Sequence, residues 1–564
     1  MQLFTPTIES IPPKGATYEL RAVGPATVRV HLHPLNPLHF VLRTAQVYPD
    51  KLAILHPDVK EPVSYSYSVW AQRIQNFAYA LIRAGVQPGD RVAVIAPNWY
   101  VSQAHHGVIA ARAVLCPINT RLTHGEVAYI LEHSGAKIII VDYEFKHLVE
   151  GAKVPVIVSN DTGRRGDPYE DFLAAGRQFS NEKGWSGLYW EPDENANAAL
   201  CYTSGTTGRP KGVMTTLRGS YLAALANAYE AGLTRDSVYL WVLPMFHACG
   251  WTYPWSITAS MATQITLRSV SNPHIWNHLL NSGVTHYCGA PTVQIGLISA
   301  PEARPVPQPV KAIIAGSAPT AQLIGDLETK GITAVHTYGP VTICYPQPAW
   351  MKLSLQERAR FLARQGRGFI TAADIRVVYQ PKEGEPIDYD APLVDVPRDG
   401  ATIGEVVMRG NITMKEYFRD PEATRKAFRG GYFNSGDLAV MYPDGYIAIQ
   451  DRSKDIIISG GENASSLAIE QELATHPDVL EVSVVARPHP RWGERPMAFV
   501  ILRANSKKKW VGKDEEFAAA LKKHARGNLP GFACPEWVQL VDELPKTSTG
   551  KIQKVQLRKI VAKL

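Results

Sequence analysis

The sequence predicts an α/β protein: a large N-terminal domain of mixed, mostly parallel sheets with helices, followed by a small α+β domain. Three observations support this prediction. At 564 residues the chain is too long for one hydrophobic core. Helical and strand patterns alternate along its first part, which is typical of parallel sheets covered by helices. A charged cluster at 451–455 opens onto an apolar strand, which indicates a boundary between domains 1–450 and 451–564.

The expected elements follow this order along the chain. Residues 1–40 are rich in proline and are expected to run over the surface of the following domain. A helix is expected over 70–84, where apolar residues recur at helical spacing, and another after the capping-box pair Thr123 and Glu126. A charged helix is expected over 513–529. Strands are expected over apolar runs at 91–96, 137–141, 198–202, 238–243, 264–267, 310–315, 456–458, 480–485 and 497–502.

The composition excludes several classes of protein. A hydrophobic fraction of 45% and a charged fraction of 20% are ordinary for a globular enzyme. The net charge of +7 is a mild excess over a large surface, so no nucleic-acid partner is predicted. No uncharged apolar run of about 18 residues occurs, so no membrane span is predicted. The six cysteines lie far apart without a C-x-x-C pair, and they are expected to be reduced, mostly buried thiols.

The two ends of the sequence bear on localisation. The N-terminus lacks the basic start and apolar run of a secretory signal. The last three residues, Ala562, Lys563 and Leu564, resemble the peroxisomal address whose prototype is S-K-L. We therefore expect a peroxisomal protein that the import receptor binds, or a cytoplasmic one if this signal is not read.

The stretch 203–212, TSGTTGRPKG, has the chemistry of a phosphate-binding loop. Its glycines let backbone N–H groups turn toward an anion, its hydroxyls add donors, and Lys211 supplies a positive charge. The spacing is not that of the Walker A loop, which excludes the common P-loop interpretation. The alternative is a flexible surface loop, but the apolar strand at 198–202 favours a loop that is anchored in a sheet.

This loop closely resembles the phosphate-binding signature of the adenylate-forming superfamily, which includes acyl-CoA synthetases, firefly luciferase and peptide-synthetase adenylation domains. The resemblance covers about residues 40–564 and is greatest to short-chain and aromatic acyl-CoA ligases. It implies ATP, Mg²⁺ and CoA as cofactor and co-substrates. It also implies that residues 451–564, which we call the lid, are mobile. In such enzymes a carboxylic acid and ATP give an acyl-adenylate and pyrophosphate, and CoA then displaces AMP.

The resemblance assigns roles to particular residues. Lys551, Lys211 and His247 would be catalytic, and Thr206 would help to hold the metal ion. Residues that would bind ATP are Thr203, Ser204, Gly205, Thr206, Thr207, Gly208, Arg209, Pro210, Lys211, Ser317, Ala318, Pro319, Thr337, Tyr338, Asp437, Arg452 and Lys551. Among these, the resemblance places the small-residue turn 315–319 against the adenine, and it assigns to Asp437 the hydrogen bonds from both ribose hydroxyls.

Further motifs assign the acyl, CoA and hinge positions. His247 and Trp251 follow an expected strand, where open α/β folds bind ligands, although a buried histidine and ordinary aromatic packing are the simpler explanation from position alone. The resemblance places both in the acyl pocket together with Gly289. It places Lys454 at the hinge of the lid, and it places three residues beside the channel for the CoA arm. These three are Ser459, Gly460 and Gly461.

The sequence departs from the family at the Tyr-Gly-x-Thr-Glu motif, whose glutamate helps to hold Mg²⁺. Tyr338 and Gly339 are followed by Pro340, as though the block between two Tyr-Gly pairs had been removed. No Asp or Glu occurs between Glu328 and Glu357. Three functions therefore stay open: an ATP-dependent acid–CoA ligase, adenylation with a different acceptor, and an ATP- and acid-binding homologue that has lost catalysis.

Overall fold

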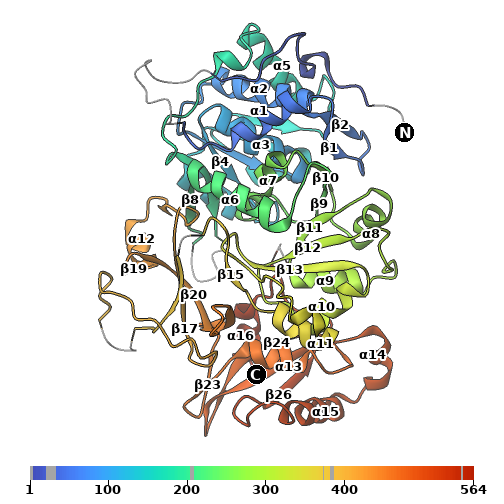
Figure 1. The fold of residues 1–564 in the computed structure, drawn as a ribbon, viewed down its shortest axis with the longest axis vertical. Coiled ribbons are helices and arrows are strands. Elements are labelled where there is room, and N and C mark those ends of the chain that lie inside the picture. Colours follow the sequence, from blue (N-terminus) through green and yellow to red (C-terminus); the bar gives the residue numbers. More distant parts are fainter. Residues whose placement is uncertain (1–3, 21–32, 204–208, 373, 382–385, 548–549) are drawn as a thin grey trace.

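The computed structural model describes the chain except residues 1–3, 21–32, 204–208, 373, 382–385 and 548–549. Its large domain lies at the top and middle of Figure 1, and the lid lies at the bottom. The helices are α1 Leu38–Val47, α2 Tyr67–Arg83, α3 Asn98–Ala110, α4 His124–Ser134, α5 Pro168–Ser180, α6 Leu217–Ala231, α7 Tyr253–Ala259, α8 Asn272–Asn281, α9 Pro291–Ile298, α10 Ala321–Glu328, α11 Leu355–Leu362, α12 Pro421–Ala427, α13 Ser466–Leu473, α14 Ala504–Trp510, α15 Asp514–Arg526 and α16 Lys554–Val561.

The first sheet has the strand order β18-β8-β7-β4-β3-β5-β6. Strands β7, β4, β3, β5 and β6 are parallel, whereas β8 and β18 are antiparallel additions at one edge. The central strands are apolar on both sides because helices cover both faces. The bounds are β3 Arg91–Ile95, β4 Val114–Pro117, β5 Ile138–Asp142, β6 Val156–Ser159, β7 Asn197–Tyr202, β8 Gly212–Thr216 and β18 Glu416–Tyr417.

The second sheet has the order β15-β14-β13-β12-β11-β9-β10-β1-β2. It is parallel from β13 to β1 and antiparallel at both edges. The bounds are β1 Leu52–His56, β2 Val63–Ser66, β9 Val238–Trp241, β10 Thr263–Thr266, β11 His286–Gly289, β12 Val310–Ile314, β13 Ile332–Tyr338, β14 Thr342–Ile343 and β15 Arg367–Gly368.

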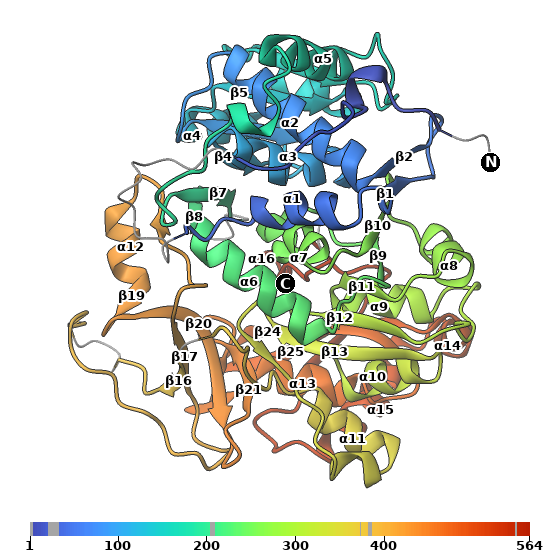
Figure 2. The same cartoon turned by 45° about the horizontal axis from the view of Figure 1, so that its top comes forward.

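One hydrophobic core joins these two sheets. It takes Val92 and Val94 from one face of the first sheet and Tyr239 and Trp241 from one face of the second, together with apolar residues of α1, α2, α3, α6 and α7. The opposite faces pack against separate sets of helices. The helical layer therefore lies between the sheets, as Figure 2 shows for α1, α6 and α7. This arrangement fixes the carboxyl ends of both sets of strands relative to each other.

A small antiparallel sheet follows, with the order β16-β17-β20-β19 and β21 paired to β20. Its interior is an apolar cluster of its own, built around Val406 and Ala439. The bounds are β16 Asp374–Val378, β17 Gly404–Arg409, β19 Phe428–Arg429, β20 Tyr432–Met441 and β21 Ile447–Arg452.

The lid contains a sheet in the order β23-β22-β25-β24, with β26 parallel to β25, and helices α13 to α16. The buried residues of its two apolar clusters all lie at or beyond Ile457. The predicted fold class, a large α/β domain and a small α+β one, is therefore confirmed, whereas the exact boundary at residue 450 stays a prediction. The strand bounds are β22 Ile457–Ser459, β23 Glu462–Ala464, β24 Val479–His489, β25 Gly493–Leu502 and β26 Trp537–Leu540.

The predicted elements are confirmed to within a few residues. The first two predicted helices are α2 and α4, and the capping box of Thr123 and Glu126 is formed. Gly135 ends α4 in the left-handed conformation, with φ of 61°. The charged helix is α15. Residues 4–20 lie against α2 and α5, where side chains of both helices donate to the carbonyl oxygen of Glu9.

The expectation for the cysteines is wrong at one position. Cys201 is disulfide-bonded in the structure, whereas Cys116, Cys288, Cys344 and Cys534 are buried free thiols. Spacing along the sequence could not reveal this, because a disulfide requires proximity in the fold and not in the chain. Among the described residues, no helix combines the length and apolar character needed to cross a bilayer.

Candidate active site

The predicted phosphate loop connects β7 to β8. The backbone N–H of Thr203 donates to the carbonyl oxygen of Lys211 at 2.9 Å, and the N–H of Lys211 donates to Thr203 Oγ1 at 3.1 Å. Tyr129 donates to the carbonyl oxygen of Pro210, and the Arg209 guanidinium lies 5.4 Å from the Tyr129 ring centroid. The base of the loop is therefore anchored to the sheet and to α4. Ser204, Gly205, Thr206, Thr207 and Gly208 lie outside the described residues.

Lys211 leaves this anchored base as an exposed side chain. Its Nζ lies 5.0 Å from the ring centroid of Tyr417, which belongs to β18 at the edge of the same sheet. A cation–π contact of this kind holds the ammonium group by about 0.5–1 kcal/mol at an exposed site. Lys211 therefore keeps its charge available for an incoming anion.

The carboxylate of Asp437 is the centre of a polar cluster. Asp437 on β20 pairs in register with Arg452 on β21, and Arg452 Nε lies 3.4 Å from Asp437 Oδ1. Tyr338 at the end of β13 donates its hydroxyl to Asp437 Oδ2. Glu405 accepts from the backbone of Gly436, whose φ of 72° suits the turn before Asp437. Since a carboxylate can accept about four hydrogen bonds, Asp437 keeps capacity for a ligand diol.

The predicted adenine turn lies at the carboxyl end of β12. Ser317 is exposed, Ala318 is half-buried and Pro319 is buried, and Gly316 before them has φ of 95°. Because β12 and β13 are parallel neighbours, Thr337 at the end of β13 lies at the same edge of the sheet. The small side chains of this turn allow a flat ligand to approach the backbone closely.

Lys551 of the lid reaches the cluster around Asp437. Desolvation and the positive charge of Arg452 lower the pKa of Lys551, Asp437 and Asp455 raise it, and the net result is a pKa of about 8. The lysine lies on a loop closed by two hydrogen bonds between Thr547 and Lys551, at 2.7 and 3.1 Å. The lid therefore places near the Asp437 carboxylate a lysine whose pKa is close to neutral pH.

The segment around His247 has an unusual backbone. Ala248, Trp251 and Thr252 all have positive φ values, of 43°, 52° and 64°. Each costs conformational energy, and such residues cluster at functional sites. The side-chain amide of Asn227 donates to both the Trp251 carbonyl oxygen and Thr252 Oγ1 at 2.8 Å, which holds this conformation in place. His247 begins this segment, which follows β9 by a short loop.

His247 is close enough to Lys551 for the two charges to interact. His247 is solvent-exposed, but desolvation by the surrounding protein, together with the positive charge of Lys551, lowers its pKa to about 4. His247 is therefore neutral near pH 7. Gly289 is buried at the end of β11, where a β-carbon would lie 2.8 Å from Gln294 Nε2. A larger residue at this position would require the neighbouring amide to move.

The predicted hinge lies between one residue fixed to the large domain and one fixed to the lid. The backbone N–H of Ser453 donates to the Gly436 carbonyl oxygen at 3.1 Å. On the other side, Arg558 of α16 donates to the Lys454 carbonyl oxygen at 3.1 Å and forms an ion pair with Asp455. Lys454 itself is exposed in the turn between β21 and β22. The Asp455 N–H also donates to the Arg452 carbonyl oxygen at 2.8 Å across this residue, so a rotation at Lys454 would have to break that one turn hydrogen bond.

The structure does not bring the predicted CoA residues to the cluster around Asp437. Ser459, Gly460 and Gly461 form the turn between β22 and β23. Their described partners belong to the lid: the Gly460 N–H donates to the Trp492 carbonyl oxygen at 2.8 Å, and Arg495 donates to Ser459 Oγ at 3.1 Å. In this orientation the lid presents Lys551, and not this glycine turn, to the large domain.

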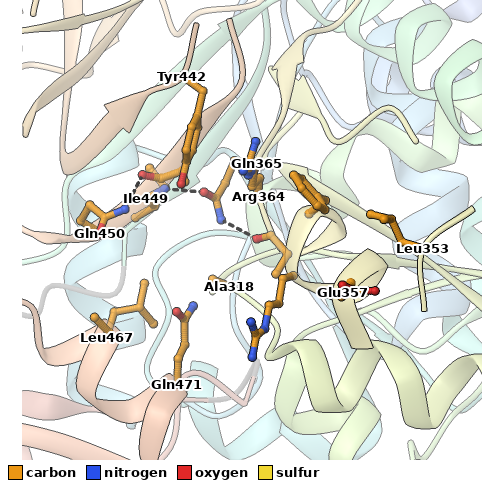
Figure 3. A pocket seen from close by; sticks show the side chains of 15 residues that line it. Ala318, Leu353, Glu357, Arg364, Gln365, Tyr442, Ile449, Gln450, Leu467 and Gln471 are labelled. Atoms are coloured by element: carbon orange, nitrogen blue, oxygen red, sulfur yellow. Dashed lines mark hydrogen bonds between the residues drawn. The ribbon is translucent and has the colours of Figure 1, made fainter. Parts of the chain in front are cut away.

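A cavity of about 610 Å³ lies where the lid meets the large domain (Figure 3). Sequence patterns could not predict this cavity, because its walls come from distant parts of the chain: from α11, from β21 and from α13 of the lid. Ala318 of the predicted adenine turn also lines it. Gln365 fixes one wall by accepting a hydrogen bond from the backbone of Ile449. Since Leu467 and Gln471 of α13 form another wall, the shape of this cavity depends on the orientation of the lid.

The described residues do not form a metal site. No group of three or more His, Cys, Asp or Glu among them could hold a metal ion. Where the family motif would supply a glutamate, β13 turns directly into β14, with Tyr338 paired to Thr342. Gly339 makes this tight turn possible with φ of 57°. The missing block is therefore absent from the fold without a substitute carboxylate cluster in the described part of the chain.

Together these residues gather cations and a carboxylate with free acceptor capacity between a large α/β domain and a lid, which suits a phosphorylated nucleoside. Comparison with known families agrees with this class. The profile of AMP-binding enzymes matches residues 41–418, and the profile of the AMP-binding enzyme C-terminal domain matches residues 468–551. The chain belongs to the AMP-binding enzyme family.

Curated relatives span nearly the whole chain. An acetate/butyrate–CoA ligase of Arabidopsis thaliana is 39% identical over 560 residues, covering 93% of this chain and 94% of the relative. An acetate–CoA ligase of Humulus lupulus is 40% identical over 553 residues, with the same two coverages. A benzoate–CoA ligase of Arabidopsis thaliana is 37% identical over 556 residues, covering 93% of each.

Solved structures share the fold. ATP-bound MatB from Rhodopseudomonas palustris superposes with a TM-score of 0.78 at 25% identity, covering 94% of this chain and 99% of that chain. A benzoate–CoA ligase from Burkholderia xenovorans superposes with a TM-score of 0.75 at 22% identity, covering 93% and 99%. The two-domain architecture is therefore that of known adenylate-forming enzymes.

Proposed function

We propose that this protein is an ATP-dependent acid–CoA ligase. In the first half-reaction a carboxylate oxygen attacks the α-phosphorus of ATP, and the bond to pyrophosphate breaks. In the second half-reaction the CoA sulfur attacks the acyl carbon, AMP leaves, and the thiol proton passes to the medium. The observation that carries this proposal is the position of Lys551, because this lid residue lies near Asp437 and His247 of the large domain and near Arg452, which pairs with Asp437.

The first half-reaction brings a carboxylate against a polyanion, so its barrier is largely electrostatic. Lys551 and the donors of the phosphate loop would offset the charge that develops on the α-phosphate oxygens. Asp437 would hold the ribose hydroxyls, and the turn Ser317–Pro319 would accept the adenine. His247 and Trp251 would border the acid, with Gly289 behind them. Neutral His247 can hydrogen-bond to the acid without adding a second positive charge beside Lys551.

The second half-reaction needs a different lid orientation. In the present orientation the described hydrogen bonds of the turn Ser459–Gly461 join it to Trp492 and Arg495 of the lid itself. Rotation about Lys454 would withdraw Lys551 and bring this turn toward the adenylate, where its glycines would leave room for the CoA arm. The domain division near residue 450 is part of this proposal.

Magnesium would enter with ATP, with Thr206 as its protein ligand. The described residues add no carboxylate set for it. This motivates the second candidate function, a homologue that binds ATP and an acid but turns over poorly. A third candidate, an adenylating enzyme with a different acceptor, shares the first half-reaction and lacks only the step with CoA.

One assay separates the three candidates. The purified protein is incubated with ATP, Mg²⁺, CoA and a panel of acetate, butyrate, 2-methylpropanoate and benzoate, which are acids that curated relatives are named for. CoA-dependent release of AMP supports the ligase. Pyrophosphate exchange without thioester formation supports another acceptor, and ATP binding without either reaction supports the impaired homologue.

We also propose that the protein is imported into peroxisomes. Ala562, Lys563 and Leu564 are exposed after the end of α16, so an import receptor can reach them. Several curated relatives are named peroxisomal, among them the acetate/butyrate–CoA ligase and the benzoate–CoA ligase of Arabidopsis thaliana. Deleting the three residues would leave a fluorescently labelled chain in the cytosol if they are the signal.

Lys551→Ala should slow the first half-reaction selectively. The expected loss is about 10²- to 10³-fold, as for removal of one oxyanion-stabilising donor. Thioester formation from synthetic acyl-adenylate should be retained, because Lys551 leaves the site for that step. Pyrophosphate exchange and single-turnover thioester assays measure the two steps. Parallel loss of both, with the circular dichroism spectrum unchanged, would contradict this role.

The first half-reaction should also lose rate at alkaline pH. Because the pKa of Lys551 is lowered to about 8, its charge is present below that pH and is lost as the pH rises through it. The kcat/KM for ATP in pyrophosphate exchange, which reports groups of the free enzyme, should therefore fall above about pH 8. In Lys551→Arg the guanidinium stays charged, so this fall should disappear. An unchanged profile in that variant would assign the inflection to another group.

Lys454→Pro should trap the lid in one orientation. Proline fixes φ near about −65°, so the rotation that exchanges the two faces of the lid becomes restricted. One half-reaction should slow by at least about tenfold more than the other, as for other hinge positions that gate a catalytic step. Lys507→Pro, which changes a lysine within lid helix α14, is the control for general damage to the lid. Equal effects on both steps would count against a hinge at Lys454.

Insertion of the family block, ending in glutamate, between Gly339 and Pro340 should accelerate adenylation. The insertion lengthens the β13–β14 turn and adds a negative charge in a site rich in cations. We expect kcat to rise more than KM for ATP falls, because metal contacts matter most as charge moves to pyrophosphate.

Glu357 is the nearest acidic residue after this turn in sequence, and it is occupied with capping α11 through Ser354. Glu357→Gln should therefore leave adenylation unchanged in both proteins across a Mg²⁺ titration. If the unmodified chain turns over at about 1–1000 per second and the insertion has no effect, the missing block has no catalytic consequence.

A further inference from the structure

A side-chain hydrogen bond joins the large domain to the lid directly beside Lys551. Thr292, the second residue of α9, donates its hydroxyl to the carbonyl oxygen of Gly550 at 2.8 Å. Gly550 immediately precedes Lys551, and its own N–H donates to the Thr547 carbonyl oxygen at 3.0 Å. Thr292 therefore holds the peptide that leads into the lysine, although it lies 258 residues earlier in the chain.

The backbone of Gly550 is adapted to this contact. A β-carbon at this position would lie 2.3 Å from Thr292 Oγ1, far inside van der Waals contact. The φ of Gly550 is also 82°, a conformation that residues with a β-carbon rarely adopt. Only glycine allows the lid backbone to come this close to α9 in this conformation. Both partners therefore allow the close approach of the two domains: Thr292 supplies the donor, and Gly550 has no β-carbon that would block it.

Thr292 lies on a firmly held part of the large domain. Helix α9 follows β11 after Gly289, and Gln294 on the same helix donates to the Gly289 carbonyl oxygen at 3.4 Å. Gln294 also accepts from the hydroxyl of buried Tyr287 at 2.7 Å. The start of α9 therefore moves little relative to the proposed acyl pocket, and it gives the Lys551 loop a fixed point of attachment.

We propose that Thr292 is a positioning residue that sets Lys551 for the first half-reaction. This inference rests on the proposed function. The hydrogen bond exists in the orientation that presents Lys551, and it must break when the lid turns to present Ser459–Gly461. Thr292 thus favours adenylation and opposes the rotation that precedes thioester formation.

The test compares Thr292→Val with Thr292→Ser. Valine keeps the shape of threonine but cannot donate, whereas serine keeps the donor. Loss of one neutral hydrogen bond corresponds to about a 2- to 10-fold change. We expect Thr292→Val to slow pyrophosphate exchange by this factor, and Thr292→Ser to restore it. Thioester formation from synthetic adenylate should be unchanged or faster in Thr292→Val.

A matched control and a readout without catalysis complete the design. Thr329 also donates its hydroxyl to a backbone carbonyl oxygen, that of Asp326 at 2.6 Å, but both of these residues belong to the large domain. Thr329→Val should leave both half-reactions unchanged. Hydrogen exchange of the peptide that contains Gly550 and Lys551 should be faster in Thr292→Val than in the wild type or Thr292→Ser.

The outcomes separate this inference from the proposed function. If the wild-type protein does not adenylate any acid, the ligase proposal fails, and hydrogen exchange alone still decides whether Thr292 holds the loop. If both half-reactions of Thr292→Val change equally, or if serine does not restore the first, Thr292 is merely structural. Unchanged exchange together with unchanged kinetics overturns the inference completely.

Discussion

The arrangement of the whole site depends on bringing Lys551 near Arg452, the last residue of strand β21, which pairs with β20 of the large domain. Two cations repel each other, and partial burial makes this repulsion stronger than in water. The carboxylates of Asp437 and Asp455 offset it in part, and the pKa of Lys551 still falls to about 8. A polyphosphate supplies the missing negative charge. Nucleotide binding and this lid orientation should therefore favour each other, because two processes that stabilise the same state are thermodynamically linked.

The small domain contacts the rest of the chain at the hinge, at the catalytic loop and at the start of α13, where Ser465 donates to the Gln450 carbonyl oxygen and Ser466 donates to Asp451. At the hinge, Ser453 is bonded to Gly436 on one side and Arg558 to the Lys454 carbonyl oxygen on the other, and a rotation between them would break the turn hydrogen bond from the Asp455 N–H to the Arg452 carbonyl oxygen. At the catalytic loop, the contact from Thr292 is a single weak bond that can be exchanged for solvent at modest cost. An enzyme with two lid orientations requires this combination, since a strong bond at the catalytic loop would trap one of them.

Much of the fold could be predicted from the sequence, because strong local patterns determine it. The buried strands of both sheets are short apolar runs, and Thr123 with Glu126 marks the start of α4. The sequence could not reveal that one helical layer is shared between two sheets, because the hydrophobic pattern of a helix does not show which distant sheet it packs against. It also could not reveal the disulfide at Cys201, which depends on proximity in space.

The candidate site shows the same division. Motif order alone singled out Asp437, Arg452 and Lys551, and the structure brings them together. The predicted CoA turn is not among them, because a sequence does not state which face of a domain is turned inward. Thr292 had no recognisable signal, since a threonine at the start of a helix is common. Its significance comes from its partner, a glycine whose conformation admits the contact.

The last helix has a practical consequence for work with this protein. Helix α16 carries Arg558, which fixes the lid side of the hinge, and it ends just before the exposed tripeptide Ala562–Leu564. An affinity tag fused after Leu564 would place the proposed import signal inside a longer polypeptide, and it would extend the helix whose Arg558 contacts the hinge. Purification through a tag at Met1 avoids both disturbances, so trafficking and lid motion can be studied in one and the same preparation.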